Sequence, residues 1–143
     1  MQYKFFGWQN TADIYAVSDD YKNIKTPFDL YNALLKIWCE YSCAPRMRNN
    51  WSEENITLGQ CSITAFLAQD IFGGKVYGTL TPLGDVHCFN VVNGVIFDLT
   101  SEQFGGEELN YTDKQEQSRE KHFSKLEKKE RYEYIKKQLK IMQ

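Results

Sequence analysis

Three residues of this chain have the types and the order that cysteine nucleophile chemistry requires: Cys61, His87 and Asp98. Cys61 follows Gly-Gln and opens the apolar stretch "CSITAFLAQDIF", which predicts a helix from Gln60 to Phe72. The macrodipole and the free N–H groups at a helix N-terminus favour the thiolate form of such a cysteine. A histidine can then carry its proton, and a carboxylate can orient the imidazole.

A predicted β-hairpin brings the histidine and the aspartate together. The segments "VHCFNVV" (86–92) and "VIFDLT" (95–100) have the composition of strands. Between them lies Asn93-Gly94, the dipeptide that favours a two-residue type I′ turn. Because side chains alternate between the two faces of a strand, this turn decides which residues share a face.

Counting outward from the turn places Phe89 opposite Asp98 and His87 opposite Thr100. These four side chains share one face, and His87 and Asp98 become diagonal neighbours roughly 6–8 Å apart at the backbone. A register slip of one residue would put them on opposite faces. Asn90 points to the other face, which favours Asp98 as the group that orients His87.

A catalytic site also needs a base and donors for an oxyanion, and the sequence offers few candidates for them. His87 is the base candidate because the other histidine, His122, lies in a charged tail where we expect solvent exposure. The backbone N–H of Cys61 would donate to an oxyanion. A side-chain amide would supply a second donor, with Gln60 preferred to Asn55.

The stretch "APRMRNNWSEENITLG" ahead of the helix is predicted to be a loop. Loops of roughly 15 residues are often functional, and Trp51 is its candidate substrate-site residue. Arg46, Arg48 and Trp51 could equally line a recognition surface in a binding module without catalysis.

The other three cysteines, Cys39, Cys43 and Cys88, are interpreted as small buried hydrophobic residues. The C-x3-C pair of Cys39 and Cys43 also allows a zinc hypothesis with His87 and Cys88. Closed zinc sites need four ligands from recognisable pairs, and a second pair is missing. We therefore expect neither a metal nor another cofactor.

The composition is that of one folded domain. The chain has 143 residues, of which 42% are hydrophobic and 15% aromatic, and its net charge is −2. This charge argues against nucleic acid or an acidic membrane as a partner. We find no signal peptide and no apolar run that could span a membrane, so we expect a cytoplasmic protein with reduced thiols.

Further elements flank the helix and the hairpin. Thr26 and Pro27 predict the start of a helix that Pro45 ends, and "KVYGTL" (75–80) predicts a strand. Residues 1–25 are expected to form a peripheral segment.

Residues 113–143 form a charged tail of one or two helices. An apolar stripe is expected to dock the final helix on the domain. It consists of Phe123, Leu126, Tyr132, Ile135 and Leu139.

The strings "GQCSITA", "HCFN" and "DLTSEQF" resemble those of the small bacterial YunG-like proteins, within the papain-like and transglutaminase-like cysteine-enzyme superfamily. The likeness runs from about Trp38 to Phe104 and on into "RYEYI". It implies one α+β domain over residues 1–143 with a papain-like (NlpC/P60- or transglutaminase-like) core. In that core a central helix carrying Cys61 packs on a small antiparallel sheet carrying His87 and Asp98, with flanking helices. Asn90, Gln103 and Phe104 also match the pattern and can have structural roles.

These observations lead to one main functional hypothesis and two alternatives. The main one is a cysteine-dependent acyl-transfer enzyme, which is a hydrolase, an amidase or peptidase, or a transglutaminase-type protein. It would act on a peptide, amide or thioester through Cys61, His87 and Asp98. The alternatives are a non-catalytic binding module with the same fold and a zinc protein.

Overall fold

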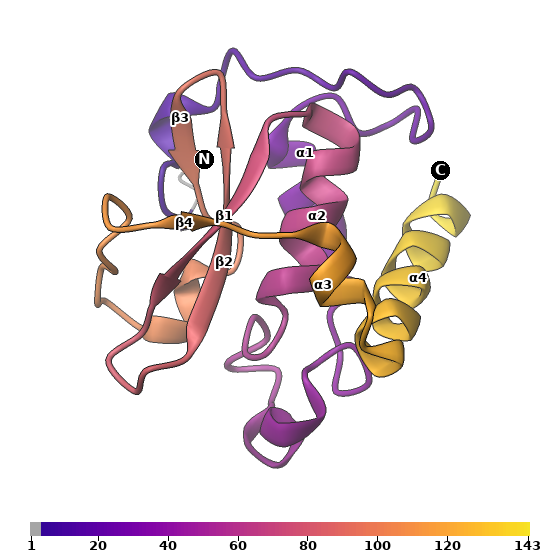
Figure 1. The fold of residues 1–143 in the computed structure, drawn as a ribbon. Helices are drawn as coiled ribbons and strands as arrows, with labels where there is room; N and C mark the ends of the chain where they lie inside the picture. Colours follow the sequence, from indigo (N-terminus) through magenta and orange to yellow (C-terminus); the bar gives the residue numbers. More distant parts are fainter. Residues whose placement is uncertain (1–3) are drawn as a thin grey trace.

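Helix α2, Cys61–Phe72, lies between the sheet and helix α4 (Figure 1). The computed structural model describes residues 4–143. Most of the twelve residues of α2 are buried, including Ile63, Leu67 and Ile71. The predicted central apolar helix is confirmed, and it ends at Gly73, whose φ of +80° suits a residue without a side chain.

The sheet has four antiparallel strands in the order β3-β2-β1-β4. They are β1 (Lys75–Leu80), β2 (Val86–Val92), β3 (Val95–Phe97) and β4 (Gln115–Glu116). The sequence predicted β1 and the hairpin but not the two-residue β4, which is too short to carry a pattern. The fold is therefore α+β with a small antiparallel sheet.

The hairpin turn forms as predicted. Asn93 has φ 52° and Gly94 has φ 79°, the two positive values that a type I′ turn requires. Val91 pairs with Ile96, which is the predicted register. β3 is shorter than expected because the chain leaves the β2 ladder after Phe97.

The N-terminal segment takes up the pairing where β3 ends. Phe6 forms a β-bridge with Asp98, whose N–H donates to the Phe6 carbonyl over 3.0 Å. Phe5 is completely buried, and Val17 N–H donates to the carbonyl of Ile71 at the end of α2. Residues 4–25 thus contribute to the core, in contrast to the peripheral segment that we expected.

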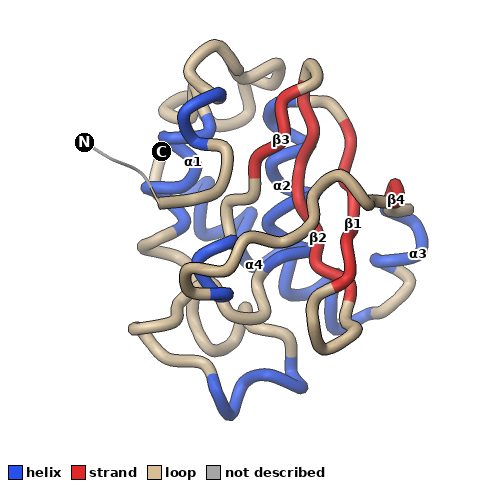
Figure 2. Tube along the Cα trace, turned by 90° about the vertical axis from the view of Figure 1, so that its left-hand side faces the viewer, coloured by secondary structure: helices blue, strands red, loops and turns tan. Residues whose placement is uncertain are grey.

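The two faces of the sheet have different covers. Asn90 on β2 donates to the carbonyl of Ala65 in α2 over 2.8 Å, so its face meets the helix. On the other face, Leu109 and Tyr111 pack on Phe89. Figure 2 looks onto the sheet and shows the strands in front of α2, with the chain that leads to β4 crossing before them.

Helix α1, Pro27–Leu34, starts as predicted and ends early. The Asp29 carboxylate accepts the N–H of Thr26 over 3.1 Å. After Leu34 the bonds tighten to the i→i−3 type, as from Ile37 N–H to the Leu34 carbonyl. Both Ile37 and Trp38, which follow this turn, are buried in the core. The chain then turns before a 3₁₀ helix, η2, over Pro45–Asn50.

The charged tail forms two helices, α3 (Arg119–Phe123) and α4 (Leu126–Ile141). Tyr132, Ile135 and Leu139 of the predicted stripe are buried against the domain, whereas Leu126 is 70% exposed. Among the residues described, no helix is long and apolar enough to cross a membrane.

Candidate active site

Cys61 is the first residue of α2, and a tight loop before it decides where the helix begins. Gly59 in this loop has φ +72°, and a Cβ there would lie 2.5 Å from Cys43 Sγ. Its carbonyl accepts a 2.9 Å hydrogen bond from Ala44 N–H. Gly59 packs directly against Cys43 and Ala44 and has a positive φ, so only glycine fits at this position. Cys61 stays partly exposed at the free N–H end of the helix.

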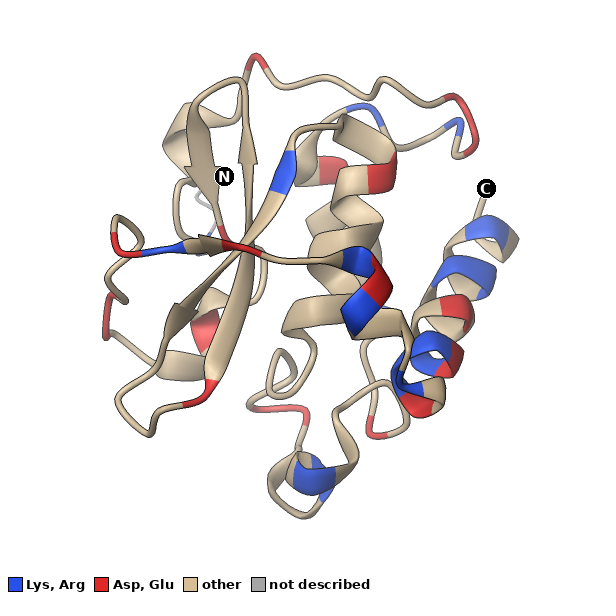
Figure 3. Cartoon of the chain, in the orientation of Figure 1, with Lys and Arg blue, Asp and Glu red and all other residues tan. Residues whose placement is uncertain are grey.

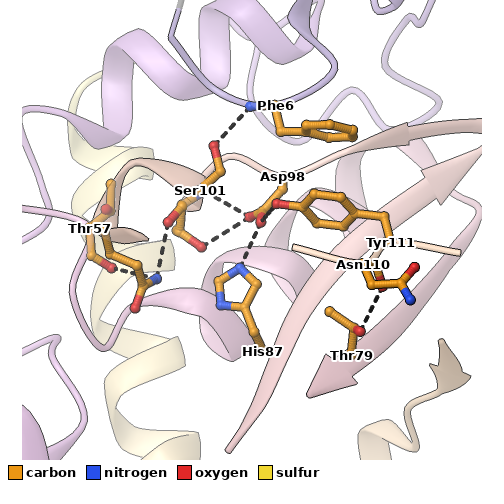
Figure 4. Close-up of polar contacts among 10 residues, drawn as sticks. Phe6, Thr57, Thr79, His87, Asp98, Ser101, Asn110 and Tyr111 are labelled. Carbon is orange, nitrogen blue, oxygen red and sulfur yellow. Dashed lines mark hydrogen bonds and ion pairs between the residues drawn. The ribbon is translucent and has the colours of Figure 1, made fainter. Parts of the chain in front are cut away.

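His87 lies on β2 with its ring buried, only 2% exposed. Its Nε2 is 2.7 Å from Asp98 Oδ2, which leaves Nδ1 for the Cys61 thiol (Figure 4). The ring of Phe104, in the 3₁₀ helix η3 (Ser101–Phe104), meets the imidazole edge-on with centroids 4.7 Å apart. The imidazole is therefore held on two sides.

Asp98 is a buried carboxylate with four hydrogen-bond donors around it. Oδ2 accepts from His87 and from the Tyr111 hydroxyl, each over 2.7 Å. Oδ1 accepts from the backbone N–H and the hydroxyl of Thr100, over 3.1 and 3.2 Å. A buried charge is tolerated only when it is bonded in this way, so Asp98 is fixed as an acceptor for His87.

The N-terminal segment supports the carboxylate from outside the hairpin. The Phe6 ring stacks on Tyr111 with centroids 4.1 Å apart, and Phe6 N–H donates to Ser101 Oγ over 2.8 Å (Figure 4). Sequence analysis missed both Phe6 and Tyr111. They come from segments far from the hairpin, and neither lies in a pattern that indicates its partner.

The charges of Cys61 and His87 stabilise each other. Hydrogen bonds from Cys88 and His87 and the His87 charge outweigh burial and hold the pKa of Cys61 well below its ordinary value. Burial disfavours the imidazolium, but the Asp98 carboxylate and the Cys61 thiolate outweigh it and raise the pKa of His87 to about 10. Both shifts favour the charged form of the pair, a thiolate and an imidazolium.

Cys88 has a role that its interpretation as a core residue did not include. It is buried on the α2 face of β2, next to His87 in sequence. Its S–H donates to Cys61 Sγ, and this bond together with burial raises the pKa of Cys88 well above its ordinary value. Cys88 thus stays a thiol and stabilises the neighbouring thiolate.

The thiolate opens into a pocket of about 650 Å³. Its walls come from the α2 start, the loop with η2, the β1–β2 turn, η3 and the start of α4. The lining includes Pro45, Met47, Leu58, Cys61, Ser62, Leu83, Val86, His87, Cys88, Gln103, Phe104, His122, Lys125 and Lys128.

The three side chains predicted to complete the site lie outside this lining. Gln60 is fully buried, and its Nε2 donates to the Cys39 carbonyl over 3.1 Å, away from Cys61. Trp51 Nε1 donates to the Ile56 carbonyl over 3.0 Å, within its own loop. Asn55 forms a β-bridge with Ser52 there. The structure therefore joins Cys61, His87 and Asp98 but not these three.

His122 lies in the pocket wall rather than in solvent. Its Nδ1 accepts from Lys128 Nζ over 2.8 Å, and its Nε2 is 3.0 Å from Gln117 Oε1. Burial and the Lys128 charge lower the pKa of His122 to about 4, so it is neutral near pH 7. His122 packs beside Phe66 of α2. The charged sequence around His122 gave no indication of this contact.

The other cysteines lie apart from this chemistry. Cys43 is buried against Gly59, and Cys39 Sγ is 3.8 Å from the Tyr134 hydroxyl. Within residues 4–143, no group of three or more His, Cys, Asp and Glu side chains is placed to hold a metal ion.

Comparison with known proteins identifies the family. Residues 26–142, which include Cys61, His87 and Asp98, match the YunG protein family. The "Uncharacterized protein YunG" of Bacillus subtilis strain 168 is 39% identical over 71 residues, which is 50% of this chain and 56% of that protein. The chain thus spans about half the length of this curated relative, and no solved structure matches significantly. Since the family match covers most of its length, the chain belongs to the YunG protein family.

Proposed function

We propose that this protein is a cysteine-dependent acyl-transfer enzyme with a papain-like or transglutaminase-like core. The observation that supports this most is the buried 2.7 Å contact between His87 and Asp98 beside the partly exposed Cys61. A thiolate, a proton carrier and a group that orients it are the three parts of a cysteine nucleophile. A binding module has no need of an activated thiol.

In the first step the Cys61 thiolate attacks the carbonyl carbon of an amide or thioester. The backbone N–H of Cys61 donates to the oxygen as negative charge develops on it. The His87 imidazolium then gives its proton to the leaving amine or thiol while the bond to the carbonyl carbon breaks. The product of this step is a thioester on Cys61 and a neutral His87.

In the second step neutral His87 takes a proton from water or from an amine, which attacks the thioester. The bond to Cys61 breaks, the thiolate returns, and His87 is again an imidazolium. Asp98 holds the ring throughout, because its Oδ2 bonds Nε2 and keeps Nδ1 toward Cys61. Water as acceptor makes the protein a hydrolase, and an amine makes it a transglutaminase-type enzyme.

The pocket supports the proposed substrate class, a peptide, amide or thioester. A space of about 650 Å³ with the apolar side chains Met47, Leu58 and Leu83 accommodates a peptide, amide or thioester group. We propose that this chemistry takes place in the cytoplasm, where the four cysteines, which are free thiols in the structure, would stay reduced.

The rate of alkylation by iodoacetamide, followed against pH for each cysteine by mass spectrometry, tests the proposal. We expect Cys61 to react with an apparent pKa well below the usual value of about 8.5. In His87→Ala this pKa should rise, and in Asp98→Asn it should rise less. Cys39 is the internal control, because it is also partly exposed but lies outside the pocket.

The same samples can be incubated with a panel of peptide and thioester probes, and the acyl-Cys61 adduct can be detected by its mass. An adduct that requires Cys61 and His87 supports the enzyme. If Cys61 reacts no faster than Cys39 at pH 6, the proposal is wrong. A binding module that uses the same pocket then becomes the better explanation.

A further inference from the structure

Two lysines at the start of α4 line the wall of the Cys61 pocket. Lys125 directly precedes the helix, and Lys128 lies in its first turn. Figure 3 shows the positive residues that gather along α3 and α4. Among residues 4–143, neither ammonium group forms an ion pair with a carboxylate.

The other basic side chains of the lining are neutralised by acidic ones. Arg46 pairs with Asp85 at 3.5 Å, and the buried Arg131 pairs with Glu127 at 2.8 Å. Glu107 is the remaining acidic residue of the lining, and it lies on the chain after η3 rather than on α4. The α4 wall therefore carries two ammonium groups that no carboxylate of the described residues pairs with.

The Lys128 ammonium is held in the pocket near Cys61, with donors left for a ligand. Its Nζ donates one hydrogen bond to His122, which is itself fixed by Gln117. An ammonium has three N–H donors, so two remain for a substrate. Burial lowers the pKa of Lys128, while the negative charge of the hydrogen-bonded pair of Cys88 thiol and Cys61 thiolate opposes this, so its ammonium interacts with this pair.

We propose that the pocket selects acyl substrates that carry a carboxylate near the scissile carbonyl, with Lys128 as the residue that binds this carboxylate and Lys125 as a second attracting charge. A partly dehydrated ammonium gains most from an anionic partner. The inference rests on the proposed function, because the thiolate of Cys61 places the reacting carbonyl beside this wall.

Iodoacetate and iodoacetamide test the inference. They are alike in size, but iodoacetate carries a carboxylate where iodoacetamide carries a neutral amide. The ratio of their rate constants at Cys61 is measured by mass spectrometry at pH 7 and low salt. Removal of a charge near the reacting carbon should lower the iodoacetate-to-iodoacetamide ratio roughly threefold to tenfold in Lys128→Met. A smaller fall is expected in Lys125→Met. The charge of His87 raises the ratio in every variant and so does not affect the comparison.

Lys129→Met is the matched control, because this exposed lysine is on the same helix but outside the pocket lining. It should leave the ratio unchanged. A ratio that stays at the wild-type value in both Lys125→Met and Lys128→Met overturns the inference and leaves the nucleophile intact. If Cys61 reacts with neither reagent, the proposed function fails instead. Lys125 is exposed, so its variant decides the matter even if Lys128→Met does not fold.

Discussion

Tyr111 donates its hydroxyl to Oδ2 of Asp98 over 2.7 Å, the same atom and the same distance as in the bond from His87. Burial and the negative charge of Asp98 raise the pKa of Tyr111, so its hydroxyl remains a donor at every ordinary pH. The carboxylate that orients the imidazole is therefore held from a segment outside the hairpin. Tyr111 acts on Cys61 only through Asp98 and His87, which makes it a positioning residue.

Replacement of this tyrosine by phenylalanine removes one donor from a buried carboxylate. We expect Tyr111→Phe to lower the free energy of unfolding by about 1.5–3 kcal/mol, the cost of a hydrogen bond to a charged group. The measurement is urea unfolding followed by circular dichroism. Tyr77→Phe is the control, because Tyr77 packs in the same cluster but does not bond Asp98. Equal losses in the two variants would show that the bond to Asp98 is not special.

The Cys88 thiol has a testable effect on the nucleophile. Because its S–H stabilises the Cys61 thiolate, Cys88→Ala should raise the apparent pKa of Cys61 and slow its alkylation at pH 6. One lost hydrogen bond to a charged atom corresponds to roughly a tenfold slower reaction or somewhat more. The pH profile of iodoacetamide alkylation measures it.

Two variants separate this effect from loss of packing. Cys88→Ser keeps an O–H donor at the same place and should restore part of the low pKa of Cys61. Cys43→Ala removes another buried thiol, which lies against Gly59 and does not bond Cys61. If all three variants shift the profile alike, Cys88 acts through packing and the hydrogen bond has no part.

The hairpin could be predicted because its information is local. Asn93-Gly94 permits one tight turn, and that turn sets the register that places His87 beside Asp98. The start of α2 at Cys61 is also local, since an apolar helical pattern begins there. Both arguments need only neighbouring residues, and both elements are confirmed.

The residues that sequence analysis missed reach the site through tertiary packing. Tyr111 and Phe6 come from irregular segments whose positions depend on the finished sheet. His122 lies among charged residues, and only the docking of α3 beside Phe66 places it in the pocket. Gln60 is adjacent to Cys61 in sequence, yet the turn into α2 directs its side chain to Cys39. Adjacency along the chain does not determine side-chain direction at a helix start.

Gln60 is accordingly expected to support the fold rather than to donate to an oxyanion. In Gln60→Met the bond to the Cys39 carbonyl is lost, and so is a buried Oε1 that has no partner among the described residues. These effects oppose each other, so we expect a loss of about 1 kcal/mol or less in the free energy of unfolding. The rate of Cys61 acylation by a thioester probe should not change. A tenfold slower acylation in a stable variant would instead assign Gln60 to the oxyanion site.

The pKa of His122 makes stability depend on pH in the acidic range. Its usual value of 6.5 is lowered to about 4 by burial and by the Lys128 charge. Between pH 6.5 and 4 the unfolded chain binds a proton at His122 that the folded chain does not bind. The free energy of unfolding must therefore fall as the pH drops through this range.

His122→Gln removes this titration and keeps a polar side chain beside Lys128. We expect wild type to lose about 1–2 kcal/mol more stability than the variant between pH 6.5 and 4, a range reduced for the partial exposure of the ring. Urea unfolding at several pH values measures both curves. The lowered pKa of Cys61 also makes the free energy of unfolding fall as the pH drops. This loss occurs in both proteins and therefore cancels when the two curves are subtracted. Parallel curves would mean that His122 takes up its proton in the folded protein between pH 6.5 and 4. Its side chain would then be a positive charge in the pocket wall rather than a neutral group.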